Sequence, residues 1–517
     1  MADANDEDRC SYTFDPERRS SVAGASVTDA FDDDNGLWRC PHDSHEDSDR
    51  CPIHLPPSET PEGAVERQFL ERIAQVGERS KQFIGAHLAD FDFEHAVVEC
   101  ADNHAIDLRY ATFEGTTTLS HAIVRQPLNL EGATFEGRAE FVDTRFQNEL
   151  YLSGATFERD VRFFGARILE GMWCYEASFE QADFHRSRLG GPADFTDAWF
   201  GNCQFRETVF TARADFDGSV FEHASFAGVQ FHDRASFDDV RFPETVVFRH
   251  AEFDDIASFD GPVPLGESTY VDLRDAILER GRLVPPEANV VFDLENATVG
   301  DVSFTEETPP PDLFDRFRLL NTTFHGFDFG AYREALNATG WEIHRTAAVP
   351  GLDAEPPSAG TLEGTYLKAK NGANEVGDTK AAAEFFRKEM TYRRHQHASG
   401  IRDGSLADRA AALWRWTANA LLDATAGYGE RPSRVVVVAL LTVVGFSLVF
   451  SVTTSTQPYG NAYGYLILSL ESFITLVLGG AASIEDPRVR LLAEVEGFMG
   501  AFLIALFVFT LTRSIHR

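Results

Sequence analysis

The stretch ADFTDAWFGNCQFRETVFTA, Ala193–Ala212, repeats itself every five residues. A phenylalanine fills one place in each unit, and alanine, cysteine or threonine stands two places before it. This period matches neither the repeat of an α-helix nor the alternation of a strand with one buried face. We therefore interpret the stretch as an internal repeat whose units stack and bury a shared core.

The same frame extends in both directions and covers residues 86–259. Large residues, mostly phenylalanine, recur there in steps of five or six. They are Phe135, Phe141, Phe146, Leu152, Phe157, Phe163, Ile168, Cys174, Phe179, Phe184 and Leu189 upstream of the quoted stretch, and Phe216, Phe221, Phe226, Phe231, Phe237, Phe242, Phe248, Phe253 and Phe259 downstream. Beyond Phe259 the period weakens to echoes at Leu273, Leu278 and Leu294.

A large residue at every fifth place with a small one two before it resembles the pentapeptide-repeat family. The resemblance implies a right-handed quadrilateral β-helix with four pentapeptides to a coil and both marked side chains pointing inward. We assign this β-helix to residues 83–330, with the clearest part at 86–259. About eight coils at the usual strand spacing give a rod about 40 Å long. Some relatives are acidic DNA mimics that inhibit topoisomerases, so that function is one alternative, beside a spacer or docking surface.

The C-terminal region, residues 431–517, has the composition of a membrane domain. Val435–Val452 and Gly497–Thr512 are uncharged apolar runs, and a spanning helix needs about 20 mostly apolar residues. The segment between them, Tyr463–Ala482, is too apolar for an exposed loop and too short to cross and return. Backbone that dips into a membrane is tolerated where it lines a cavity or is buried in protein. This order predicts a span, a re-entrant helix and a second span.

Tyr465–Arg513 resembles the pore module of the two-transmembrane potassium-channel superfamily. The matching residues are Ser469, Leu470, Phe473, Thr475, Gly479, Arg490, Leu491, Leu492, Glu496, Gly500, Ala505, Leu506 and Phe507. The resemblance implies a homotetramer that conducts cations, with a conduction path lined by Thr475, Leu476, Val477, Leu478, Gly479 and Gly480.

The filter of that family reads Thr-x-Gly-Tyr-Gly-Asp, and its backbone carbonyls replace the hydration shell of potassium. Here Val477 stands at the first glycine, and a β-branched residue disfavours the left-handed backbone that glycine adopts freely. The departure puts potassium selectivity in doubt. The alternative is a membrane-anchored scaffold that does not conduct.

Charge places the ends of the chain and suggests its surroundings. Arg431 and Arg434 precede the first span, while Arg513 and Arg517 follow the second. Positive residues favour the cytoplasmic side, so we expect a multi-pass plasma-membrane protein with both termini in the cytoplasm, in contact with membrane lipid. The net charge is −36, and only five of the 46 basic residues are lysines. This composition suggests a halophilic, high-salt cytoplasm, in which excess surface charge is screened.

The acidic surface also argues against direct nucleic-acid binding. We find no nucleophile–base pair, phosphate-binding loop or open metal site, and we expect a protein that is not an enzyme. The β-helix would then dock or gate through a cytoplasmic protein partner that the sequence does not identify.

The acidic N-terminal segment, residues 1–62, contains three cysteines and a C-x2-H pair. Cys10, Cys40, Cys51 and His54 form a plausible zinc-binding quartet, with His42 or His45 as substitutes, because zinc takes four such ligands and supplies folding energy that a small core lacks. Four protein ligands would make the site structural. The alternative is a set of reduced, unliganded thiols in a disordered tail. An amphipathic helix is predicted to follow over residues 63–82.

Between the β-helix and the membrane region we predict a linker at 331–360 and a helical segment at 361–430. Leu362–Val376 and Thr379–His395 are expected to form an αα-hairpin, because Gly377 would end the first helix and Asp378 would cap the second. A third helix, Leu406–Leu422, carries tryptophans that prefer the membrane interface, and we expect it to lie along the inner membrane face.

Overall fold

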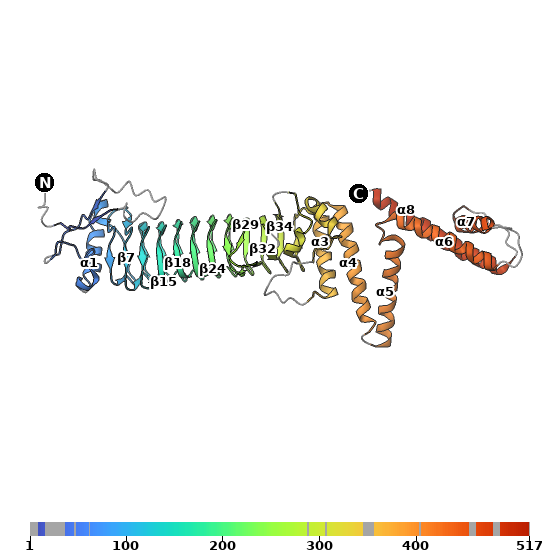
Figure 1. The fold of residues 1–517 in the computed structure, drawn as a ribbon, viewed down its shortest axis with the longest axis horizontal. Helices are drawn as coiled ribbons and strands as arrows, with labels where there is room; N and C mark the ends of the chain where they lie inside the picture. Colours follow the sequence, from blue (N-terminus) through green and yellow to red (C-terminus); the bar gives the residue numbers. More distant parts are fainter. Residues whose placement is uncertain are drawn as a thin grey trace. The chain divides into compact units, whose positions relative to one another are not determined.

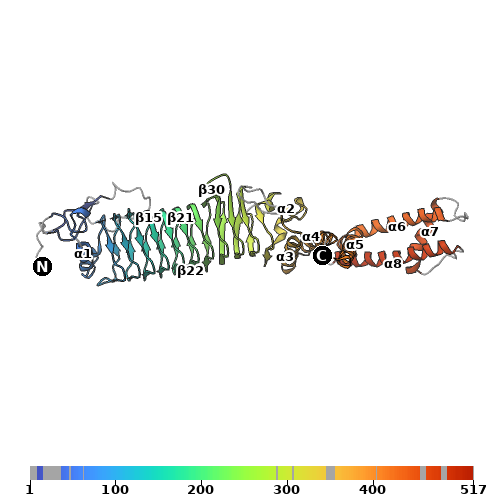
Figure 2. The ribbon, with the colours of Figure 1, turned by 90° about the horizontal axis from the view of Figure 1, so that it is seen from below.

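A computed structural model describes residues 9–15, 37–45, 48–61, 63–286, 289–305, 308–344, 356–402, 405–453, 462–478 and 486–515. The chain divides into two compact units, residues 1–355 and 356–517, and each is described by itself. Figure 1 and Figure 2 show the first unit as a stack of short strands and the second as a group of helices.

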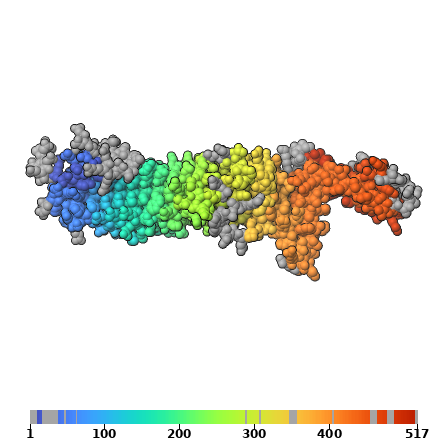
Figure 3. Space-filling model, in the orientation of Figure 1, coloured from blue at the N-terminus to red at the C-terminus, as the bar shows by residue number. Residues whose placement is uncertain are grey.

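The first unit is a β-solenoid of about 11 turns. Its strands run from β3 (His87–Leu88) to β36 (Thr323–Phe324), and each pairs in parallel with strands of the neighbouring turns. Most are two residues long; the longer ones are β15 (Thr156–Arg162), β18 (Ser178–Asp183), β21 (Trp199–Gln204), β24 (Val220–Ser225), β28 (Thr245–Val247), β29 (Glu252–Asp260), β31 (Thr269–Asp272), β32 (Ile277–Val284), β33 (Val290–Asp293) and β34 (Thr298–Ser303). Figure 3 shows one outer face of this stack in space-filling form.

The short strands follow from the corners of each turn. Left-handed backbone recurs once per turn along two edges, for example at Asp143, Gly165 and Arg186 on one edge. Such a residue turns the chain sharply, and asparagine, aspartate and glycine tolerate the conformation best. Each side of a turn therefore holds only a few extended residues before the next corner, so most strands are short.

The phenylalanines stack in register through the core, which confirms the pentapeptide interpretation. Phe157, Phe179, Phe200 and Phe221 are fully buried, and neighbouring rings lie 4.8–5.1 Å apart with planes within 9° of parallel. Offset stacking of aromatic rings adds about 0.5–1.5 kcal/mol per pair beyond burial. One ladder thus couples each turn to the next.

The solenoid continues beyond Phe259, where the phenylalanine period fades. Leu273, Leu278 and Leu294 are fully buried in turns formed by β31 to β34. The fading is therefore a change of core side chain and not of fold, and the solenoid has more turns than the eight expected from residues 86–259 alone.

Two predicted segments differ from what is observed. The helix expected over 63–82 is α1 (Ala64–Ile73) followed by a short 3-10 helix, η5 (Glu78–Lys81). Gly77, at φ 113°, breaks it, and the buried ammonium of Lys81 is held by the Gly77 carbonyl and by Asp102. Part of the predicted linker at 331–360 is also folded: η7 (Phe329–Tyr332) and α2 (Arg333–Ala338) pack on the last turn.

The second unit is helical. It comprises α3 (Ala359–Glu375), α4 (Thr379–Gly400), α5 (Leu406–Ala426), α6 (Pro432–Thr453), α7 (Ala462–Leu478) and α8 (Pro487–Ile515). The αα-hairpin is confirmed: Gly377 has φ 77°, and the Asp378 side chain accepts the Ala381 amide. Only α6 and α8 are long and apolar enough, within the described residues, to cross a membrane.

Candidate functional site

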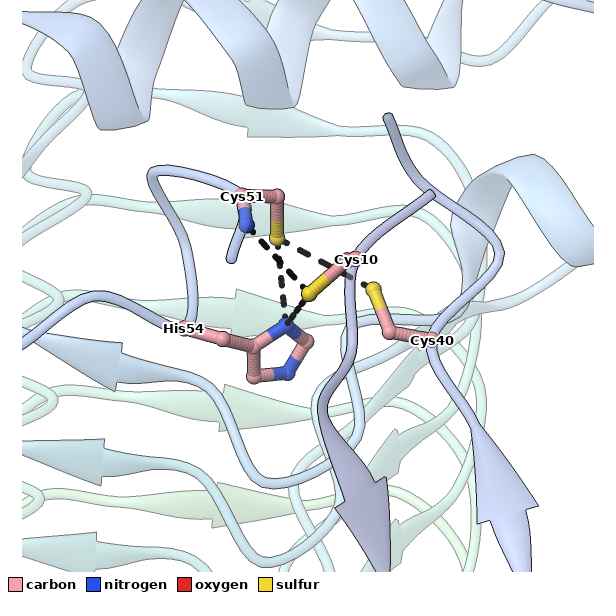
Figure 4. A group of neighbouring side chains, drawn as sticks. All are labelled: Cys10, Cys40, Cys51 and His54. Atoms are coloured by element: carbon pink, nitrogen blue, oxygen red, sulfur yellow. Dashed lines mark hydrogen bonds between the residues drawn. The ribbon is translucent and has the colours of Figure 1, made fainter. Parts of the chain in front are cut away.

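Three cysteines and one histidine meet in the N-terminal segment (Figure 4). Cys10 precedes β1 (Thr13–Phe14), and Cys40 follows β2 (Trp38–Arg39), which pairs antiparallel with β1. Cys51 and His54 come from one tight turn, closed by the His54 amide donating to the Cys51 carbonyl at 2.9 Å. All four side chains are buried.

The four ligand atoms lie within 4.8 Å of one another. The Cys40 and Cys51 sulfurs are 3.8 Å apart, and His54 Nδ1 lies 3.8 Å from the Cys10 sulfur and 3.1 Å from the Cys51 sulfur. Sulfurs held at about 2.3 Å from a tetrahedral zinc stand about 3.8 Å apart, whereas a disulfide needs about 2.05 Å. These cysteines form no disulfide, and the group could hold a metal ion.

The thiols of this group perturb one another. Hydrogen bonds from Cys40 and Cys51 lower the pKa of Cys10 far below its usual range. Burial raises the pKa of Cys40, and hydrogen bonding with Cys10 raises that of Cys51 to about 12. Several thiolates this close together need a cation to stabilise them.

The two substitute ligands predicted from the sequence lie outside this group. His42 is buried, but its Nε2 lies 2.8 Å from the Gln82 carbonyl oxygen, at the first turn of the solenoid. His45 is half-buried, and its backbone amide donates to the Arg50 carbonyl. The quartet of Cys10, Cys40, Cys51 and His54 is therefore the set that the fold brings together.

The second candidate site lies among α6, α7 and α8. At one level, Leu468 of α7 packs with Phe450, near the end of α6, and Val489, near the start of α8. At another level, Phe473 of α7 packs with Val443 and Leu503, in the middle of α6 and α8. Val489 and Leu503 are separated by about 21 Å along a helix. Along α7 the chain thus runs from the level of the end of α6 to the level of the middle of α6 and α8. The helix α8 then begins again at the first level.

A buried polar contact fixes α7 between the two long helices. Ser469 donates its hydroxyl to the carboxylate of Glu496 on α8, and the same hydroxyl lies 2.8 Å from the Val443 carbonyl oxygen on α6. Both side chains are fully buried. Buried polar groups are retained where they are paired, so this contact links all three helices.

The predicted pore-lining residues fall at the end of α7. Thr475, Leu476, Val477 and Leu478 are helical, and Gly479 and Gly480 lie outside the described residues. These four positions therefore continue α7 instead of forming the extended filter backbone of the channel family.

An apolar cavity of about 340 Å³ adjoins α7. It is lined by Val435, Val436, Ala439, Leu440, Val443, Leu470, Phe473, Ile474, Leu503, Ile504 and Phe507, all from α6, α7 and α8. The outer faces of the long helices are apolar as well, with Leu440, Leu448, Phe498 and Phe502 exposed. In water such surfaces would be unfavourable, so they require lipid or neighbouring helices.

Comparison with known proteins identifies the first unit. A family described as pentapeptide repeats (9 copies) matches residues 119–167, 175–220 and 216–261. The solenoid over these residues is built of pentapeptide repeats. The match ends before the helical unit, so the resemblance of Tyr465–Arg513 to a channel remains an expectation. No curated protein and no solved structure matches the chain.

The four candidate metal-binding residues could be recognised in the sequence, but their contacts with the pentapeptide-repeat solenoid could not. Cys10 and His54 are 44 residues apart, yet their residue types point to a common chemistry. The bond from His42 to the Gln82 carbonyl carried no such signal, because every residue has a carbonyl. In the sequence, Ser469 and Glu496 stood out as residues that match the pore module, and the hydrogen bond between these two side chains is seen in the fold.

Proposed function

We propose that residues 432–515 are the pore-forming module of an oligomeric cation channel, and that the solenoid is its cytoplasmic docking or gating domain. The observation that carries the proposal is the course of α7. Its N-terminal half packs at the ends of α6 and α8, its C-terminal half packs at their middle, and α8 starts again at the ends. A helix that enters and withdraws without crossing is the arrangement in which backbone at membrane depth lines a path.

The direction of α7 supports a cation as the conducted ion. α7 runs from the ends of α6 and α8 toward their middle, and the C-terminal direction of a helix carries partial negative charge that stabilises a cation. Two spans cannot enclose a path alone, so the pore requires several copies, and four is the number that the resemblance implies. The exposed apolar faces and the cavity between α6 and α8 provide surface for neighbouring copies and for lipid.

The test is ion flux through the purified full-length protein in lipid vesicles. We expect potassium or sodium flux, with little chloride flux. A cysteine at position 475 (Thr475→Cys) should allow a positively charged thiol reagent to block it. Ser451→Cys, at an exposed site on α6, is the matched control and should conduct equally before and after the reagent. Absence of flux from the wild-type oligomer would remove the proposal.

A non-conducting membrane scaffold is the second candidate, and one observation favours it. Thr475–Leu478 continue the helix instead of forming the extended filter of the channel family. On this alternative, α6 and α8 tether the solenoid to the membrane, and the same vesicles show no flux while the solenoid still recruits its cytoplasmic partner. Neither candidate gives either site a catalytic role.

At the N-terminus we propose that zinc binds Cys10, Cys40, Cys51 and His54. Four protein ligands leave no open position, which is the mark of a structural site. Elemental analysis of the purified full-length protein should find one zinc per chain. Cys51→Ser should lose it, whereas Cys100→Ser, which changes a buried cysteine outside the group, should keep it. Equal metal content in the two variants would rule the site out.

A further inference from the structure

We propose that the metal-binding segment is a cap that completes the open backbone edge of the first solenoid turn, and that metal binding holds this cap in place. The proposal rests on the zinc site proposed above. A solenoid needs its terminal turns covered, because an uncovered sheet edge offers unpaired backbone groups and apolar core to other chains. The edge in question is formed by residues 82–98, the first turn.

Backbone hydrogen bonds on one face of the solenoid all run from one turn to the next. The Phe83 amide donates to the Asp107 carbonyl at 2.7 Å, and the Gly85 amide donates to the Arg109 carbonyl at 2.8 Å. Later turns repeat this direction on the same face. The carbonyls of Asp107 and Arg109 therefore accept from the preceding turn, and the first turn has no preceding turn.

The orphaned carbonyls of this face belong to Gln82 and Ile84. Gln82 pairs with Asp107, so Gln82 and Ile84 are the first-turn counterparts of the two acceptors named above. His42 Nε2 lies 2.8 Å from the Gln82 carbonyl oxygen, and His54 Nε2 lies 3.0 Å from that of Ile84. Two imidazoles thus take the place of the missing amides.

On the next face the hydrogen bonds run in the opposite direction, so the orphaned group is an amide. There the Thr112 amide donates to the Ala86 carbonyl of the preceding turn. His87 is the first-turn counterpart of Thr112. Its amide donates at 2.9 Å to the carbonyl of Ile53, which lies between two of the metal ligands. The cap therefore matches the reversed polarity of the second face.

The bond to Ile84 also sets the chemistry of the metal ligand. A carbonyl only accepts, so His54 must carry its proton on Nε2. Its Nδ1 is then left with a lone pair, and that atom faces the sulfurs of Cys10 and Cys51. A ligand histidine is commonly oriented by donating its other N–H to a carbonyl. One ring thus joins the metal site to the solenoid edge.

Apolar contacts cover the rest of the N-terminal end of the solenoid. Phe69 of α1 packs on Phe83, Phe91 and Phe93, with ring centroids 4.9, 5.2 and 5.1 Å apart. Among its described residues, the metal-binding segment from Cys10 to His54 has the strands β1 and β2, of two residues each. Two such strands are too small to fold unaided, and a structural metal supplies that folding energy.

The decisive measurement is hydrogen exchange, followed by mass spectrometry, on the full-length protein before and after zinc chelation. We expect exchange in peptides covering residues 82–98 to rise roughly tenfold or more, the effect of losing one hydrogen bond's worth of protection. Peptides from residues 193–260, deep in the stack, should not change. Zinc loss without faster exchange in the first turn would overturn the cap. A protein that never contained zinc would instead contradict the metal assignment.

Two substitutions separate the edge bond from metal binding. His42→Ala removes a partner of the edge without removing a ligand, so zinc content should stay at one per chain while exchange in residues 82–98 rises. His42→Gln retains a side-chain N–H and should restore protection. His54→Cys keeps four metal-binding side chains but cannot donate to Ile84, and it should combine bound zinc with a less protected first turn. Full protection in both His42→Ala and His54→Cys would contradict the proposal.

Discussion

Gly500 of α8 lies against the backbone carbonyl of Phe473 in α7, so closely that a Cβ atom at position 500 would stand 2.1 Å from that oxygen. No real Cβ atom approaches a carbonyl oxygen so closely, so the two helices meet here through backbone alone. Small residues permit such contact between membrane helices. The position of α7 along α8 therefore depends on the absence of a side chain at residue 500.

Replacing this glycine should displace α7. We expect Gly500→Val to lower the free energy of unfolding of the detergent-purified protein by about 2 kcal/mol or more. Overpacking a well-packed core costs about 1–3 kcal/mol. Gly445→Val is the control, since a Cβ at Gly445 on α6 meets nothing within 4 Å. Equal melting curves for the two variants would show that the contact does not form.

Removing the Ser469 hydroxyl should leave a buried acid without its partner. The second carboxylate oxygen of Glu496 has no hydrogen bond among the described residues, so Ser469→Ala would leave the side chain unpaired there. Such a loss costs about 1–3 kcal/mol. Adding Glu496→Gln should cost less than the sum of the two single changes, because the residues share one interaction. Ser451→Ala, whose hydroxyl bonds only its own helix at Leu448, should be neutral in the same thermal assay.

Truncating one rung of the core ladder should open a cavity. Phe205 is fully buried and stacks between Phe184 and Phe226 at 4.7 and 5.0 Å. Phe205→Ala is expected to cost about 3–5 kcal/mol, and hydrogen exchange should speed up most in β18, β21 and β24. Phe164 points outward and is 36% exposed, so Phe164→Ala should change exchange little. Equal effects of the two substitutions on hydrogen exchange would mean that the stacked phenylalanines do not stabilise the solenoid.

The exposed tryptophans of α5 should touch lipid. Trp414 is 74% exposed, and Leu413, Leu421 and Leu422 on the same helix are also exposed. Tryptophan prefers the interface of a membrane. We expect brominated lipids to quench part of the fluorescence of the reconstituted protein, and Trp414→Phe to remove much of that part. Trp173→Phe, in the solenoid, should leave the quenched part intact. Quenching that is the same in both variants would place α5 away from the membrane.

Much of the fold could be read from repetition. A phenylalanine at every fifth place admits few structures, because only a stacked chain buries so many evenly spaced rings. The apolar lengths of α6 and α8, and the Gly377-Asp378 punctuation between α3 and α4, were equally direct. Prediction failed where the signal was local and a distant contact prevailed. Residues 63–82 have a helical pattern, but Gly77 and the buried Lys81 break it, since Asp102 holds the ammonium from the second turn.

The sequence by itself determined the periodic core, the two long apolar segments and the four residue types suited to zinc, because period, length and ligand chemistry are properties of the chain. Only the tertiary structure decided that His54 joins the three cysteines and that His42 lies outside this group, against the Gln82 carbonyl, since both are histidines near cysteines and differ only in which atoms they meet. It also decided how deep α7 lies, because that depth is set by Gly500 and Phe473, 27 residues apart. Contacts between backbone atoms leave no mark on composition, so they become visible only when the chain is folded.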